Sequence, residues 1–280
     1  MSTISCIIVS YNNGSFLKEA ILSVVNQTLP VKEIIVADDG STDGSRDLII
    51  SLAHEHSKIK PIFREKNLGV SINRDLAIRA AQSHLITTVD GDDWYSPQKI
   101  EQEFIAFNKR ENSIAYSDIC VTQQKIEQNY CLDLAMFADF NQQQRLSWMI
   151  NNLVKIPRDM LFSKKLYLEI GGIQHSLKKY EDWEFKIRLA ACPNPWIHSG
   201  IDGINYRKTN FGLSQDNSLM HIKYQYQALR LNHKLIREYL GEQQFWLSLG
   251  KVLLTTERSI FGIRSNFKKL HQAFLSLSKR

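Results

Sequence analysis

The chain has 280 residues, of which 43% are hydrophobic and 23% are charged, and its formal net charge is +6. This length suits one large domain, or one domain with an appended segment, and the composition excludes a disordered or fibrous protein. Residues 251–280 hold seven Lys or Arg against one Glu, so this segment alone carries a net charge of +6. The nearly neutral remainder argues against a main domain that binds nucleic acid.

The first apolar run, CIIV (6–9), is too short for the core of a secretion signal, and no run of about 18 apolar residues predicts a transmembrane helix. The four cysteines have wide and irregular spacing without a CxxC pair: Cys6, Cys120, Cys131 and Cys192. We therefore expect neither a disulfide nor a zinc site, and a reducing cytoplasm as the compartment.

Short apolar strands alternate with helical patterns over the first 120 residues. The predicted strands are 4–10, 33–40, 59–64, 84–90 and 113–119. The predicted helices are 15–27, 43–56, 70–82 and 96–110, the last of which opens with Ser-Pro. Such alternation is typical of β-α-β units, so we expect an α/β fold with a mostly parallel sheet and helices on both faces.

The turn after the first strand reads SYNNGSF (10–16) and contains neither GxGxxG nor GxxxxGK[ST]. NAD-type and P-loop sites are therefore set aside.

Residues 120–175 are polar and mixed, and we expect strands and loops there that complete the sheet and shape an acceptor pocket. From about Leu219 the pattern is helical, with basic residues interleaved toward the end. We expect a main domain over 1–215 and a helical C-terminal segment over 216–280.

Polar residues stand where three predicted strands end: Ser10, Tyr11 and Asn12; Asp38 and Asp39; and Asp90, Asp92 and Asp93. In an open α/β sheet, ligands bind outside these carboxyl ends. The acids in DDGSTD (38–43) also suit a turn and a helix cap. The crowding in DGDD (90–93) is harder to explain without a ligand, because close carboxylates repel unless a cation or protons intervene.

Mg²⁺ is typically held by one or two carboxylates together with substrate phosphates. The DGDD acids therefore predict a metal–phosphate site, in which Gly91 allows close backbone approach. Asp92 is the predicted metal ligand. The sequence leaves two roles open for Asp93, a second metal ligand or a helix cap. For Trp94 and Tyr95 it leaves open packing in the core or contact with the acceptor.

Seven segments in this order resemble the family 2 glycosyltransferases: SCIIVSYNN, EIIVADDGSTDGS, NLGVSINRDLAIRAA, ITTVDGDDWY, GGI, KKYEDWEFKIRL and YRKTNFGLS. The resemblance runs through residues 4–118 and resumes at 171–214. It implies the GT-A fold of nucleotide-diphospho-sugar transferases, with 1–118 as the nucleotide-sugar-binding half and 119–215 as the acceptor-binding half.

The same resemblance implies roles for individual residues. Tyr11 would stack on the nucleotide base, Asp39 would accept a hydrogen bond from a ring N–H, and Arg74 would lie near the base and diphosphate. Asp90 would contact the ribose or the donor sugar. Asp92, with Asp93 beside it, would bind the Mn²⁺ or Mg²⁺ that bridges the diphosphate. The nucleotide-sugar set is completed by Ser10, Asn12 and Gly91.

Asp182, in YEDWEF (180–185), matches the catalytic base of the family, with Glu181 and Trp183 on the acceptor side. Acids in the first turn of a helix are also ordinary, because the helix dipole favours them. Trp183 and Phe185 would serve the core, an acceptor platform, or both. A base of this kind takes the proton of an acceptor hydroxyl as the hydroxyl attacks the anomeric carbon, and direct displacement inverts the anomeric configuration.

Two positions depart from the family pattern. Asp75 stands where the family usually has Asn, which puts one donor-side contact in doubt or adds negative charge near the site. Thr209 or Asn210 occupies the region where many relatives carry a histidine, and we expect the nearest histidine, His198, to be structural. Metal binding would then depend more on Asp92 and the phosphates.

These features favour an inverting, metal-dependent glycosyltransferase with a nucleotide-sugar donor. UDP is favoured because Asp39 suits a base with an N–H, although dTDP and GDP are not separated from it. The acceptor would be a glycan or a lipid-linked molecule in surface polysaccharide synthesis. The alternative is an inactive sugar-nucleotide- or partner-binding protein of the same fold; a nucleotidyltransferase is weaker, because SYNNGSF lacks its glycine-rich basic loop. The C-terminal helices would cover the core, form a dimer interface, or rest on an anionic membrane.

Overall fold

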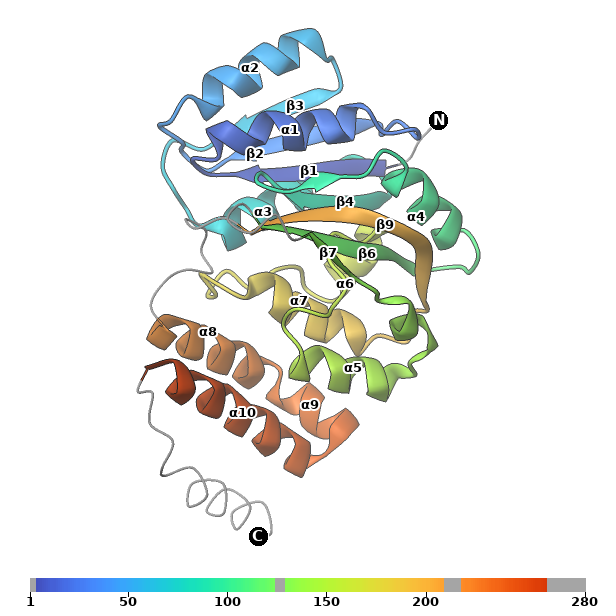
Figure 1. The fold of residues 1–280 in the computed structure, drawn as a ribbon, viewed down its shortest axis with the longest axis vertical. Helices are drawn as coiled ribbons and strands as arrows, with labels where there is room; N and C mark the ends of the chain where they lie inside the picture. The colour runs from blue at the N-terminus through green and yellow to red at the C-terminus, as the bar shows by residue number, and fades with distance from the viewer. Residues whose placement is uncertain (1–3, 124–128, 209–217, 261–280) are drawn as a thin grey trace. The chain divides into compact units, whose positions relative to one another are not determined.

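A computed structural model describes residues 4–123, 129–208 and 218–260 (Figure 1). The chain forms two compact units. The first comprises Met1–Asp139, Lys155–Ile173 and Asn194–Thr209, and the second comprises Phe140–Val154, Gln174–Pro193 and Asn210–Arg280. Among the described residues, no helix has both the length and the apolar character of a membrane span.

The first unit contains a five-stranded sheet in the order β3-β2-β1-β4-β8. Its strands are β1 (Ile4–Ser10), β2 (Glu33–Asp38), β3 (Ile59–Phe63), β4 (Leu85–Asp90) and β8 (Phe162–Ser163). The first four are parallel, and β8 is antiparallel to β4. Every residue of β1 and β2 is buried, as their continuous apolar sequences require when helices cover a parallel sheet.

The helices that follow these strands are α1 (Gly14–Val25), α2 (Ser45–Glu55), α3 (Val70–Ala80) and α4 (Lys99–Phe107). Each overlaps a segment for which the sequence predicts a helix, so the alternation of strands and helices is confirmed (Figure 1). The parallel sheet with flanking helices confirms the predicted α/β class.

A second sheet of the first unit has the order β5-β9-β6-β7. Its strands are β5 (Trp94–Tyr95), β6 (Ile114–Gln123), β7 (Tyr130–Leu132) and β9 (Trp196–Lys208). The fifth predicted strand, 113–119, is thus part of this second sheet, where β6 runs parallel to β9. Aromatic rings fill the sheet's buried side: Phe137, in the 3-10 helix η1 (Ala135–Asp139), lies 5.9 Å from Tyr116 and 5.0 Å from Trp196, between ring centroids.

The centre of β9 passes very close to β6 and α4. A Cβ atom added to Gly203 would overlap the Ser117 side chain and lie 2.8 Å from Cγ of Lys99. Lys99 is fully buried and forms an ion pair of 2.9 Å with Glu103, which accepts a 2.8 Å hydrogen bond from Ser117. Only glycine therefore fits at position 203.

The second unit is helical in its described residues. It contains α5 (Gln142–Asn151), α7 (Glu181–Ala190), α8 (Ser218–Leu231), α9 (His233–Leu240) and α10 (Glu242–Ile260). The buried Trp183 indole donates to the Met149 carbonyl at 2.8 Å, which joins α7 to α5. The three last helices confirm the helical pattern predicted from about Leu219.

The prediction of strands and loops over 120–175 is wrong for two segments, which form α5 and α6 (Lys164–Glu169). The polar sequence NQQQ (141–144) is a helix start rather than a loop. Asn141 accepts from the Gln144 backbone N–H at 2.9 Å, and the Gln144 side chain accepts from the Asn141 N–H at 2.9 Å. This reciprocal capping box satisfies two N–H groups that a helix start leaves open.

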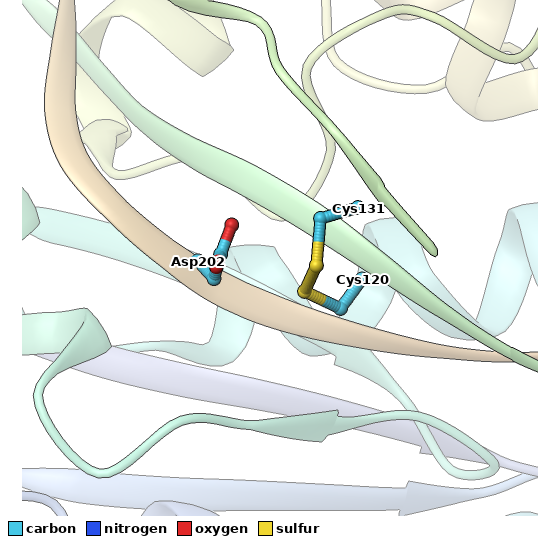
Figure 2. A group of neighbouring side chains, drawn as sticks. All are labelled: Cys120, Cys131 and Asp202. Carbon is cyan, nitrogen blue, oxygen red and sulfur yellow. A yellow bond between two sulfur atoms is a disulfide. The ribbon is translucent and has the colours of Figure 1, made fainter. Parts of the chain in front are cut away.

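The expectation of no disulfide is also wrong, because Cys120 and Cys131 are bonded (Figure 2). The two residues are directly opposite in the antiparallel β6–β7 pair, with their Cα atoms 4.0 Å apart. The sequence separation of 11 gave no sign of this pairing. Asp202 lies beside the two sulfurs, but disulfide sulfurs are not thiolates, so the trio is no zinc site in this state.

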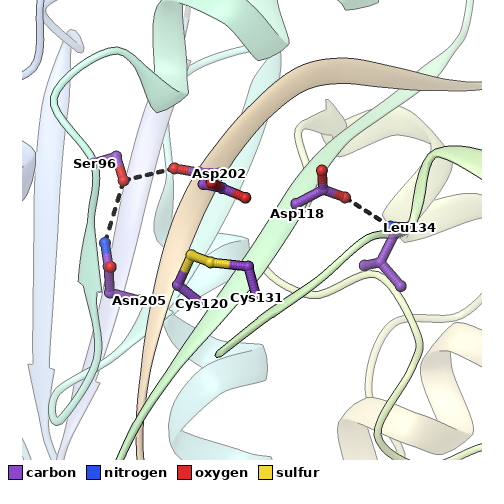
Figure 3. The surroundings of a disulfide bond; sticks show 7 residues. All are labelled: Ser96, Asp118, Cys120, Cys131, Leu134, Asp202 and Asn205. Carbon is purple, nitrogen blue, oxygen red and sulfur yellow. Dashed lines mark hydrogen bonds between the residues drawn. A yellow bond between two sulfur atoms is a disulfide. The ribbon is translucent and has the colours of Figure 1, made fainter. Parts of the chain in front are cut away.

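A further contact holds the chain after β7 (Figure 3). The Leu134 N–H donates to the Asp118 carboxylate at 2.7 Å, and the same carboxylate lies 2.9 Å from Nε2 of His198. Strand β7 is thus fastened by its disulfide and by a side chain of β6. His198 lies in β9, in a structural contact of the kind expected from its position.

Candidate functional site

The carboxyl ends of β2, β1 and β4 come together in the first sheet. Ser10 is paired with Asp38, and Val9 is paired with Asp90. The Gly91 N–H donates to the Val9 carbonyl at 2.9 Å, and a Cβ at Gly91 would lie 3.0 Å from that oxygen. The predicted polar strand ends therefore share one edge, and Gly91 lets the chain after β4 approach β1.

The chain after β1 and β2 is fixed by side chains of the site itself. Asn12 has a left-handed backbone (φ 52°); its N–H donates to Oγ of Ser41 at 2.8 Å, and its side-chain oxygen accepts from the Thr42 N–H at 2.9 Å. Asp38 accepts from the Ser41 N–H and from Nε of Arg46, both at 3.0 Å. Asp38 is thus a turn residue, one of the two roles that the sequence left open for this segment.

Tyr11 and Asp39, the residues predicted to hold the base, differ in exposure. The Tyr11 side chain is 47% exposed, so its ring is free to stack on a planar ligand. Asp39 is buried, and its two oxygens accept from the backbone N–H groups of Leu68 (2.9 Å) and Gly69 (2.8 Å). Its carboxylate therefore fixes the loop that leads into α3, and its role toward a base stays a prediction.

The three acids after β4 form one group. The carboxylate oxygens of Asp90, Asp92 and Asp93 lie within 4.8 Å of one another. Nη2 of Arg74, on α3, is 2.6 Å from Asp90. Nη2 of Arg158 is 3.3 Å from Asp90 and also 3.3 Å from Asp93.

Arg207, near the end of β9, contacts the same group through its backbone and its side chain. Its N–H donates to Asp93 at 2.8 Å, and its Nε donates to the Asp92 carbonyl at 3.0 Å. Its guanidinium lies 4.5 Å from the ring centroids of Trp94 and Phe16, and it pairs with Glu19. Trp94 therefore supports Arg207.

Tyr95 is buried and serves packing. Its hydroxyl lies 3.0 Å from Oγ1 of Thr87 and donates to the Thr88 carbonyl. Of the two roles left open for Tyr95, the structure shows the packing one.

Asp92 differs from its two neighbours. Within the described residues, its carboxylate makes no hydrogen bond to another residue and has no ion pair within 4.0 Å. Burial, and then the charge of Asp90, raise the pKa of Asp92 to about 6. Burial also raises the pKa of Asp93 well above its usual range, although Arg158 opposes this.

A hard divalent cation would fit this group. The donor atoms are carboxylate oxygens, which Mg²⁺ and Mn²⁺ prefer, and a cation beside Asp92 would stabilise the charged form that burial and Asp90 disfavour. The oxygens of Asp93 already face Arg158 and the Arg207 N–H. The geometry thus favours Asp92 as a metal ligand, and a metal role for Asp93 stays a prediction.

Arg158 and Arg207 were missed by sequence reasoning. Arg158 lies in the segment 152–161, whose sequence shows no pattern that would bring it to the DGDD acids. Arg207 lies in the YRKTNFGLS segment but was given no role. The balance of charge was the one available signal. Three close carboxylates need cations nearby, and the residues matched by the family resemblance offered only Arg74 as one.

The predicted acceptor-side residues belong to the second unit. Glu181 and Asp182 begin α7, and Asp182 is 2.8 Å from Nζ of Lys186, one turn later. The Asp182 side chain is 38% exposed. Trp183 is buried in the contact with Met149 described above, which is the core role of the two that were left open. The chemistry of Asp182 stays a prediction.

Asp75, which departs from the family pattern, has a structural role. Its carboxylate accepts from the Tyr167 hydroxyl at 2.5 Å and from Nε of Arg79 at 2.8 Å. A Cβ at Gly172 (φ 65°) would lie 2.7 Å from the same carboxylate. Asp75 thus joins α3 to the double-glycine turn. Thr209 and Asn210, the other departure, lie outside the described residues.

Comparisons with known proteins bear on the family and the fold. The family model described as glycosyl transferase family 2 matches residues 5–171. A cholesterol galactosyltransferase of Borreliella burgdorferi is 30% identical over 244 residues, 78% of this chain and 63% of that protein. The putative teichuronic acid biosynthesis glycosyltransferase TuaG of Bacillus subtilis is 28% identical over 43% of this chain and 48% of that protein. The chain therefore spans less than two thirds of the length of either relative.

Among solved structures, S. aureus TarS 1–349 in complex with UDP-GlcNAc superposes with a TM-score of 0.71. The match covers 96% of this chain and 78% of that one, at 18% identity, which shows a shared fold. The predicted GT-A fold is thereby confirmed. With a family model that matches more than half of its length, the chain belongs to glycosyl transferase family 2.

Proposed function

We propose that the protein transfers a sugar from a nucleotide-sugar, with UDP as the preferred nucleotide, to a hydroxyl group of a glycan or lipid-linked acceptor. The observation that carries this proposal is the carboxylate of Asp92, which has no partner in the described chain and lies beside Asp90 and Asp93 at the carboxyl edge of the parallel sheet. A divalent cation with a diphosphate is the ligand that such a group fits.

Two observations support a UDP-linked donor. TarS, which shares the fold, has been solved with UDP-GlcNAc and with UDP. In this chain, the exposed Tyr11 directly follows β1 and the buried Asp39 directly follows β2, and the residues before them, Ser10 and Asp38, are paired in the sheet. The donor sugar is not specified by these residues.

The acceptor proposal draws on the relatives. One is named for galactosyl transfer to cholesterol, a lipid hydroxyl, and another for the synthesis of teichuronic acid, a polymer. We therefore place this chain in surface glycan or glycolipid synthesis.

In the proposed reaction, the acceptor hydroxyl attacks the anomeric carbon and the nucleoside diphosphate leaves with its bonding electrons. Asp182 takes the hydroxyl proton as general base, and the configuration at the anomeric carbon inverts. Arg74 lies at the acidic group and stabilises the charge of the leaving diphosphate. Mn²⁺ or Mg²⁺, when bound by Asp92, would supply Lewis-acid stabilisation to the same phosphates.

The test is release of UDP from UDP-sugars in the presence of Mn²⁺ and a lipid or glycan acceptor. Asp92→Asn and Asp182→Asn should each lower the rate by about 10²-fold or more, the usual size of a lost general base or charge-stabilising group. Asp47→Asn, which removes an exposed carboxylate on α2, is the matched control and should keep the full rate. Full activity of either site variant would refute its assigned role.

Nucleotide binding without UDP release would instead support the inactive binding protein considered above. A thermal-shift series with UDP, GDP, dTDP and CMP, each with and without Mn²⁺, separates the nucleotides because a bound ligand stabilises the folded state by mass action. The largest shift should come from UDP with Mn²⁺. A larger shift with GDP or dTDP would overturn the choice of UDP.

A further inference from the structure

Arg158 stands between two of the three site carboxylates. One nitrogen, Nη2, lies 3.3 Å from Oδ2 of Asp90 and 3.3 Å from Oδ2 of Asp93. Its guanidinium also covers the Tyr206 ring, with Cζ 4.3 Å from the ring centroid. The side chain is only 21% exposed. A cation of the protein therefore already bridges two acids of the predicted metal site.

The loop that delivers Arg158 is fastened to β4 and α4. The next residue, Asp159, has a left-handed backbone (φ 47°), and its carbonyl accepts from Oγ1 of Thr87 at 2.9 Å and from Nζ of Lys99. The Asp159 carboxylate accepts from Oγ1 of Thr88 at 3.2 Å. Side chains of β4 and α4 thus hold both the carbonyl and the carboxylate of Asp159, so the position of Arg158 is built into the fold.

This arrangement limits what a metal ion alone can find. The oxygens of Asp90 and Asp93 that face Arg158 are satisfied by its charge, which leaves Asp92 as the carboxylate with no partner among the described residues. One carboxylate binds a divalent cation weakly, and Mg²⁺ sites of this kind are completed by substrate phosphates. Arg158 also repels a second cation at short range.

We propose that Arg158 is a resident counter-cation that keeps the acidic group from binding a divalent metal by itself, so that the metal is recruited together with the nucleotide diphosphate. The proposal rests on the proposed function, since it concerns the same donor site. It makes metal and nucleotide affinities mutually dependent: each ligand raises the affinity of the other by the same factor. Arg158 is a positioning and charge-balancing residue in this view, without a proton-transfer role.

The test measures Mn²⁺ binding by electron paramagnetic resonance of the free hydrated ion, with and without UDP. The wild-type protein should bind Mn²⁺ alone weakly and at least about ten-fold tighter with UDP, within the usual range of coupling between sites. Arg158→Gln should bind Mn²⁺ alone at least about ten-fold tighter than wild type, because Asp93 loses its cation and Asp90 keeps only Arg74. Arg158→Lys, which keeps the charge, should behave as wild type does.

Two further variants locate the effect. Arg79→Gln removes a half-exposed guanidinium that pairs with Asp75, away from the acidic group, and should leave Mn²⁺ binding unchanged. Adding Asp92→Asn to Arg158→Gln should abolish the gained Mn²⁺ affinity. Equal or weaker binding of Mn²⁺ alone by folded Arg158→Gln would overturn the proposal.

The proposal can still be tested if Arg158→Gln does not fold. The wild-type protein alone decides, because tight binding of Mn²⁺ without UDP would also overturn the proposal, whereas weak binding that UDP strengthens would support it. Failure of the proposed function has a different signature: no UDP binding at any Mn²⁺ concentration. In that case the comparison of Mn²⁺ affinities between wild type and Arg158→Gln still tests the role of Arg158.

Discussion

Adjacent residues of the acidic group have different surroundings in the fold. Asp93 is buried and accepts from the Arg207 backbone and from Arg158, whereas Asp92 has neither contact through its carboxylate. The difference follows from the turn after β4, in which the Asp93 N–H donates to the Asp90 carbonyl at 3.0 Å. Two of the acids thus anchor basic residues, and the third is left for a ligand.

Glu103 should make the stability of the protein depend on pH. Burial raises the pKa of Glu103 to about 7, against an ordinary value of 4.5, in spite of the ion pair with Lys99. Between these two values the folded state holds a proton that the unfolded state has lost. The free energy of unfolding should therefore fall as pH rises from about 4.5 to about 7, by up to about 1.4 kcal/mol per pH unit, and level off above.

Urea unfolding at several pH values measures this slope. Glu103→Gln should abolish the fall between pH 5 and 7, because the amide does not titrate there. It should also lower stability above about pH 7, where Glu103 is ionised and Lys99 would lose its buried charged partner. Asp202→Asn, at an exposed acid of the same unit, should keep the slope. A slope that persists in Glu103→Gln would show that another group causes it.

At the scale of elements, the start of α5 depends on one side chain. Asn141→Ala removes the acceptor for the Gln144 N–H and should lower the free energy of unfolding by about 1 kcal/mol. Asn141→Asp keeps an acceptor and should match wild type, because Asn and Asp are about equal at this position. Equal stability of all three proteins in urea unfolding would show that α5 does not need its cap.

The Cys120–Cys131 bond should contribute measurably to the stability of the second sheet. In the entropic account, a disulfide with a sequence separation of 11 raises the free energy of the unfolded state by about 2–3 kcal/mol, because it restricts the unfolded chain. Reductant should therefore lower the midpoint of thermal unfolding in wild type and leave a Cys120→Ala/Cys131→Ala protein unaffected. A reductant effect of the same size in the double variant would exclude the disulfide as its cause.

The elements that sequence reasoning placed well are those with a local signal. Buried strands such as β1 and β2 show as continuous apolar runs, and α9 shows as part of an amphipathic stretch. The two errors depend on contacts that are invisible in a linear pattern. The polar composition of NQQQ predicts a loop, although Asn141 caps a helix. Cys120 meets Cys131 only because β6 and β7 pair in one register.

For the whole molecule, the basic end of the chain predicts contact with an anionic membrane surface. Residues 261–280, which lie outside the described part, include five Lys or Arg and no acid. Each such residue near an anionic leaflet contributes about 1 kcal/mol. The intact protein should co-sediment with phosphatidylserine vesicles at low salt, and a protein ending at Ile260 should bind at least about ten-fold less.

Neutral vesicles and high salt are the controls, and both should abolish binding by the intact protein. Equal binding by the intact and shortened proteins would leave the tail as a core cover or a dimer contact. A cytoplasmic location, with contact at the inner face of a membrane, stays a prediction. The domain limits 1–215 and 216–280 also stay predictions. The disulfide removes one of the grounds for a reducing compartment.

The site was predictable to the extent that it lies on one stretch of chain. Asp90, Asp92 and Asp93 follow a single strand, so sequence and the rule for strand ends found them together. Arg158 reaches them from a loop almost 70 residues later, and Arg207 from a strand later still. Charge balance required such cations, but the identity of the residues that supply them depends on tertiary structure.

The close packing at Gly203 links the interior to the acidic group of Asp90, Asp92 and Asp93. A methyl group there would push against Ser117 and Lys99, and Lys99 holds the carbonyl of Asp159, next to Arg158. Gly203 is also four residues before Arg207 on the same strand. In a screen for inactive mutants, a Gly203→Ala protein that still folds would thus be grouped with variants of Asp90, Asp92 and Asp93, although residue 203 is not one of the acids. Genetic maps of this enzyme family therefore need a folding measurement beside each activity score.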